Sequence, residues 1–198
     1  MFVSLNNIIS FWQWFETVST SLFANTTDVN ILSDLNYKIK MFGPFEWEIG
    51  PVDDKLLYLA ISPNLNEELL KTTAEIISYA PSCEGWWFLN AKPKKEYSPV
   101  LYMVNENGKG ISIDISAWTY VLFHFDDDTF DIDLKISPIE GNMKTQKLAA
   151  DIILTNLLGE ERFITLIKNI QIVNEFGENE NNATQISYIN EHIDKVLS

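Results

Sequence analysis

The sequence predicts an α+β protein in which a mostly antiparallel sheet of about five to seven strands is covered on one face by helices. Three observations lead to this fold class. Apolar residues recur every three or four positions in several segments, which is typical of amphipathic helices. Elsewhere, apolar and polar residues alternate, as in half-buried strands. The 198 residues are 46% hydrophobic and contain no Pro/Gly/Ser-rich linker, so a single domain over 1–198 is expected.

The helical spacing indicates an apolar stripe facing the core in each helix. Helices are predicted over 5–23, between Asp28 and Gly43, over 64–80, over 142–158 and over 186–196. Asn64 with Glu67 three residues later resembles a capping box, and Gly159 is placed to end the fourth helix in a left-handed conformation.

Alternating or β-branched runs predict the strands. They cover 45–49 and 56–62 as a hairpin, then 86–90, 100–104, 111–115, 120–136 as a second hairpin, and 168–173. Residues 160–167 either continue a helix or lead into that last strand. The acidic, Asn-rich run over 175–184 is expected to be a mobile loop.

The hairpin over 120–136 gives the clearest register. A two-residue turn at 127–128 places Phe125 opposite Phe130 and keeps the aromatic residues on the core side. A three-residue loop would pair Phe125 with Thr129 and mix polar with aromatic residues on one face. The two-residue turn is therefore predicted.

The charge bounds the kinds of partner. The formal net charge is −14, from 28 Asp and Glu against 14 Lys and Arg, and Arg162 is the only arginine. Such a balance argues against a nucleic-acid partner and against an anionic membrane surface, because both would repel the chain. A protein partner with a basic surface would be attracted instead.

Cysteine content and hydropathy indicate a cytoplasmic protein. Cys83 is the only cysteine, so neither an internal disulfide nor a cysteine-based zinc site is expected. The apolar N-terminus lacks the basic start and cleavage site of a signal peptide. No run reaches the ~18 apolar residues of a membrane span.

Several short segments resemble an uncharacterised family of bacterial proteins. They are Trp47-Glu48-Ile49-Gly50-Pro51, Ile61-Ser62-Pro63, Ala80-Pro81 before Gly85-Trp86, Ala91-Lys92-Pro93 and Leu158-Gly159-Glu160. The similarity covers about Trp47 to Val173. The resemblance implies a fold but no activity, so no functional residue is carried over from it.

The candidate catalytic residues are His124 and Asp131. The predicted register places them opposite each other, and a carboxylate beside an imidazole is the arrangement that orients a general base. No nucleophile accompanies them: Cys83 is next to Glu84, which makes its thiol less reactive. A solvent-facing cross-strand pair is the alternative interpretation.

Acidic residues at the hairpin tip are the candidate metal ligands. Asp126 and Asp128 supply the oxygen atoms that calcium or magnesium prefers, but their spacing does not match an EF-hand loop. A polar turn that discourages aggregation explains the same residues. No metal and no cofactor is therefore expected.

Two further groups of residues are candidates for binding at the surface, and each also has an ordinary structural interpretation. Lys92, Lys94 and Lys95 form a basic patch beside aromatic residues and are the candidate anion site, or else a solvated loop. Trp12 and Trp14 lie two apart on one helix, so either one of them marks an interaction surface or the helix is buried on two sides.

The function expected from these observations is non-catalytic binding by an acidic accessory protein of bacterial origin. An immunity-type protein that neutralises a basic toxin fits the charge. The alternatives are a hydrolase or metal-dependent enzyme using His124 and the hairpin acids, and a small-anion binder at the Lys92 loop.

Overall fold

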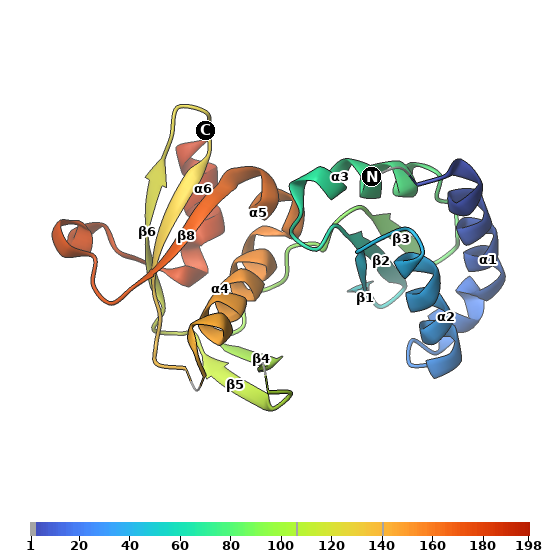
Figure 1. Ribbon diagram of the computed structural model, residues 1–198, viewed down its shortest axis with the longest axis horizontal. Coiled ribbons are helices and arrows are strands. Elements are labelled where there is room, and N and C mark those ends of the chain that lie inside the picture. Colours follow the sequence, from blue (N-terminus) through green and yellow to red (C-terminus); the bar gives the residue numbers. More distant parts are fainter. Residues whose placement is uncertain (1–2, 106, 140) are drawn as a thin grey trace. The chain divides into compact units, whose positions relative to one another are not determined.

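The chain forms two compact units in a computed structural model, residues 1–93 and 94–198, where the sequence predicts one domain (Figure 1). The structure describes residues 3–105, 107–139 and 141–198. The α+β class is confirmed. The single sheet of five to seven strands is wrong, because the described strands form separate sheets of three, two and four strands.

The first unit packs helices around a three-stranded sheet. Its elements are α1 (Leu5–Ala24), α2 (Val29–Lys40), β1 (Glu46–Asp53), β2 (Leu56–Ser62), α3 (Glu67–Ser78) and β3 (Trp86–Leu89). The predicted hairpin of β1 and β2 is confirmed, and β3 lies parallel to β2. Its core is drawn from residues 3–88 and includes Phe15 and Phe45, both fully buried.

Side-chain caps fix where the helices of this unit begin. The Asp28 carboxylate accepts hydrogen bonds from Asn30 N (3.0 Å) and Ile31 N (3.2 Å) at the start of α2. Helix α3 is capped by Asn66 rather than by Asn64. Asn64 has a φ of 53° and belongs to a left-handed turn ahead of the cap, which is why the expected capping box does not form.

The second unit contains the other two sheets. Its elements are β4 (Val100–Val104), β5 (Gly110–Asp114), β6 (Thr119–His124), β7 (Phe130–Lys135), α4 (Met143–Leu158), α5 (Glu160–Leu166), β8 (Ile167–Val173), the 3-10 helices η1 (Gly177–Asn182) and η2 (Ile186–Tyr188), β9 (Thr184–Gln185) and α6 (Ile189–Val196). Strands β4 and β5 pair with each other, and the four-stranded sheet has the order β8-β7-β6-β9.

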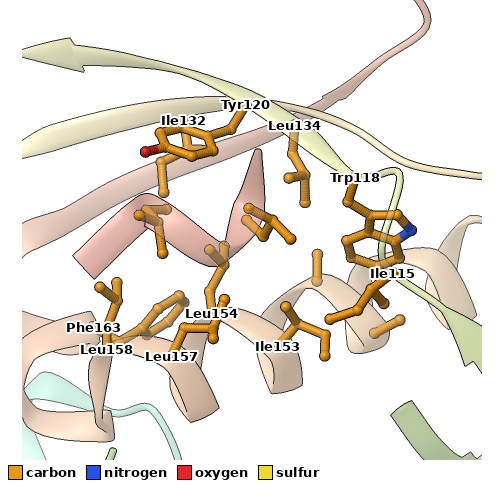
Figure 2. Packing of buried hydrophobic residues seen from close by; sticks show 14 of the residues in the cluster. Ile115, Trp118, Tyr120, Ile132, Leu134, Ile153, Leu154, Leu157, Leu158 and Phe163 are labelled. Atoms are coloured by element: carbon orange, nitrogen blue, oxygen red, sulfur yellow. The ribbon is translucent and has the colours of Figure 1, made fainter. Parts of the chain in front are cut away.

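One face of the four-stranded sheet packs on α4 and α6. Figure 2 shows Tyr120, Ile132 and Leu134 pointing from the strands towards Leu154 of α4, and all four side chains are fully buried. The segment that the sequence left open is α5 up to Leu166 and β8 after it.

The segment 174–183, which follows β8, is anchored to the sheet by Lys135. Lys135 Nζ lies 3.3 Å from Glu180 Oε1 and 5.6 Å from the centroid of the Phe176 ring. Phe176 N also donates to Glu180 Oε2 at 3.2 Å. These contacts give the acidic run a defined local structure that includes η1.

Candidate functional site

The face of β7 opposite the core carries carboxylates. Phe130, Ile132 and Leu134 are buried, and the alternation of the strand turns the residues between them to the other face. Asp131 lies there opposite Phe123, and Asp133 lies opposite Val121. We call this surface of β6 and β7, together with the turn 126–128, the acidic face.

The turn between β6 and β7 adds three acids to that face. Phe125 N donates to Thr129 O at 2.9 Å, so the turn has three residues, and the predicted two-residue turn is wrong. Asp128 takes a left-handed φ of 61°. Asp127 Oδ1 accepts from Thr129 N (3.2 Å) and Thr129 Oγ1 (2.5 Å), and the side-chain hydrogen bond is the largest cause that lowers the pKa of this carboxyl.

His124 does not face Asp131. It lies opposite Phe130, where the two rings stack with centroids 4.9 Å apart and an interplanar angle of 25°. Its Nε2 is 3.3 Å from Asp128 Oδ1. The hydrogen bonds within the turn set the register of the hairpin. As a result, His124 and Asp131, the expected catalytic pair, are not directly opposite each other.

The tip acids do not form a metal site in the part of the chain that is described. No group of three or more His, Cys, Asp or Glu residues there is placed to hold one ion. Asp126 and Asp128 are both exposed, and Asp128 contacts His124.

The three lysines of the predicted anion site belong to different units. Lys92 lies in the first unit, whereas Lys94 and Lys95 lie in the second. Lys95 N donates to Asn156 O at 2.6 Å, which fixes the start of the second unit against α4. Anion binding by this loop stays a prediction.

The two tryptophans of α1 have different environments. Trp12 is buried, and its Nε1 donates to Ile76 O at 2.8 Å. Trp14 is half-buried, with Lys38 Nζ 5.0 Å from its ring centroid. Trp14 is therefore the partly exposed one of the pair.

The thiol of Cys83 is less acidic than usual, because burial raises its pKa.

A hollow of about 490 Å³ lies at the edge of β6, and the sequence analysis did not predict it. Amide, hydroxyl and imidazole groups share its lining with strand residues: Asn179, Asn181, Asn182, Thr184, His192, Val121, Leu122, Phe123 and Ala183. The Asn-rich composition of the run was the available signal. The position of the hollow depends on where the pairing of β9 with β6 ends, and the amino-acid composition does not determine this.

His192 is held in place at this hollow by Tyr120. The Tyr120 hydroxyl lies 2.9 Å from His192 Nδ1, and burial raises the pKa of the phenol. When the Tyr120 hydroxyl donates to Nδ1 of the His192 ring, the ring proton lies on Nε2, which can donate a second hydrogen bond. The arrangement can offer a hydrogen bond to a ligand.

None of the described helices combines the length and the apolar character needed to cross a membrane. No protein-family model, curated protein or solved structure matches this chain.

Proposed function

We propose that the protein is a non-catalytic binding protein whose acidic face contacts a basic protein partner, in the manner of an immunity-type protein. The observation that carries this proposal is the alternation of β7. It turns Asp131 and Asp133 away from the core, on the hairpin that also carries Asp126, Asp127 and Asp128 at its turn.

Charge supports the same proposal at the level of the unit. Residues 94–198 contain 17 Asp and Glu against nine Lys and Arg. A surface of one sign accelerates encounter with a partner of the opposite sign and disfavours partners of the same sign. Phe123, which is half-buried, lies among the carboxylates of this face and provides apolar contact area.

No comparable observation supports the enzyme interpretation or the anion-binding interpretation. The enzyme interpretation required His124 opposite Asp131, and the observed register pairs His124 with Phe130. The anion interpretation needs Lys92, Lys94 and Lys95 to form one patch, and it stays a prediction.

The proposal is tested by charge reversal on the acidic face. Proteins retained by the immobilised wild type are identified, purified and titrated calorimetrically against wild type, Asp131→Lys/Asp133→Lys and the control Asp34→Lys/Glu75→Lys. The control changes net charge equally at exposed helix positions of the first unit. We expect the face variant to lose at least about tenfold in affinity and the control to lose about twofold or less.

Equal losses in the two variants would mean that only net charge matters, and they would contradict a defined binding face. Circular dichroism of both variants checks that the fold is kept.

A further inference from the structure

We propose that the free edge of β6 binds an extended, lysine-containing segment of the partner as an added strand, an inference that rests on the proposed binding function. Strand β9 pairs with Thr119 and Tyr120. Strand β6 continues to His124, and within the described residues it has no strand partner on this side beyond Tyr120. An edge of this kind is a template for another chain.

The main-chain groups of this edge point away from β7. In an antiparallel ladder, directly opposed residues alternate between pairs that exchange hydrogen bonds and pairs that do not. Because Phe125 N donates to Thr129 O, the pairs at Phe123 and Val121 are the bonded ones. The N–H and C=O groups of Leu122 and His124 are therefore directed to the opposite side, where β9 no longer covers the strand.

The hollow lies beside this uncovered stretch and suits a peptide. Its volume of about 490 Å³ is within the usual range for a ligand site. Side-chain amides both donate and accept hydrogen bonds, so Asn179, Asn181 and Asn182 match the N–H and C=O groups of a peptide main chain. The His192 ring, oriented by Tyr120, adds a further polar group.

The neighbouring charges define the side chains of the occupant. An added strand would place every second side chain over the acidic face, next to Phe123. Neighbouring strands are about 4.8 Å apart, so the added strand would lie roughly 10 Å from β7. A lysine side chain of the added strand and the side chain of Asp131, extended towards each other, can span this distance. Continuing past His124, it would run beside Asp126 and Asp128 of the turn.

The probe is the peptide acetyl-Lys-Val-Lys-Val-Thr-Val-Lys-amide, compared with the same peptide N-methylated at its valines. The two peptides carry the same charge, but the methylated one lacks N–H donors along one edge. Binding is followed by amide-resolved NMR spectroscopy of the full chain. We expect the first peptide to shift the amide signals of Leu122 and His124, and the methylated peptide to bind at least about tenfold more weakly.

A variant that fills the hollow provides the second arm. Asn181→Phe changes an exposed lining residue, so folding is expected to be kept, and we expect it to weaken the first peptide by about tenfold. Asn174→Phe, an exposed position on the same segment outside the lining, is the control.

Two results would overturn strand addition: equal affinity for both peptides, or shifts that fall elsewhere than the edge of β6. In either case Asp131→Lys/Asp133→Lys can still abolish partner binding, so the acidic face would stand without the added strand. Failure of that charge reversal on the purified partner would refute the proposed function itself.

Discussion

Two buried tyrosine hydroxyls contribute to the response of the chain to alkali. Tyr120 bonds to His192, and Tyr58 donates to the carboxylate of Glu48. Burial is the main cause that raises the pKa of both phenols above the ordinary value of 10.0. Such a group contributes stability that is fully present below the unfolded-state pKa and is lost as pH rises towards the folded-state pKa.

We therefore expect the free energy of unfolding to fall as pH rises above about 10, and to fall less steeply in Tyr58→Phe and Tyr120→Phe. Urea titrations at a series of pH values measure this slope. Tyr102→Phe, at a position whose side chain is 79% exposed, is the control and is expected to follow the wild type. A mutant slope as steep as that of the wild type would contradict the role of these two hydroxyls.

Trp12 and Trp14 provide a second comparison at the residue scale. Trp12→Phe leaves the buried carbonyl of Ile76 without its indole donor and removes buried ring atoms, so we expect a loss of about 2–3 kcal/mol in the free energy of unfolding. Trp14→Phe is expected to cost about 1 kcal/mol or less. Urea denaturation monitored by circular dichroism measures both, and similar losses would argue against the buried hydrogen bond.

At this scale the sequence predicts the alternation of β7 but not the partner of His124. The alternation follows from one strand and its hydrophobic pattern. The register depends on a left-handed Asp128 and on two bonds from Thr129 to Asp127, which together outweigh the segregation of Phe125 from polar neighbours. Phe125 is consequently 45% exposed.

Among the elements, the β6–β7 turn can be tested through its left-handed residue. Glycine adopts a positive φ without the steric cost that a Cβ adds, so Asp128→Gly relieves strain that Asp126→Gly does not. Both variants gain the same freedom in the unfolded chain. We expect Asp128→Gly to be more stable than Asp126→Gly by about 1 kcal/mol in urea denaturation. Equal stabilities would mean that Asp128 is not constrained in the left-handed region.

The helices and strands themselves are largely predictable, because caps and periodicity act locally. Asp28 and Gly159 mark their helix ends as expected. What the local signals leave out is which strands share a sheet. β4 and β5 pair only with each other among the described strands, and a hydrophobic alternation looks the same in a two-stranded and a six-stranded sheet.

For the whole molecule, the two separate cores lead to a prediction about fragments. The core of the first unit is drawn from residues 3–88, and that of the second from residues 101–193. Because each core is complete within its unit, we expect the fragments 1–93 and 94–198 to fold separately and to unfold cooperatively in urea. A fragment that remains disordered would show that its core needs the other unit.

The division into units is also what the composition could not show. A boundary is usually recognised by a flexible, polar linker, and the junction at Pro93 and Lys94 lies in residues 90–99, which join β3 to β4 and form neither helix nor strand. Only the three-dimensional contacts distinguish such a junction from a loop within a single domain.

The connection that brings β8 beside β7 affects how the chain folds while it is being synthesised. Strands β6 and β7 are joined by a short turn and can pair as soon as Lys135 has left the ribosome. Strand β8 lies parallel to β7 and is made only after α4 and α5. Until α4 has been made, Ile132 and Leu134 lack the helix that covers them, and until β8 has been made, β7 lacks its parallel neighbour. The interval between the translation of β7 and that of β8 therefore leaves an apolar sheet face and an unpaired strand edge exposed, and both favour aggregation.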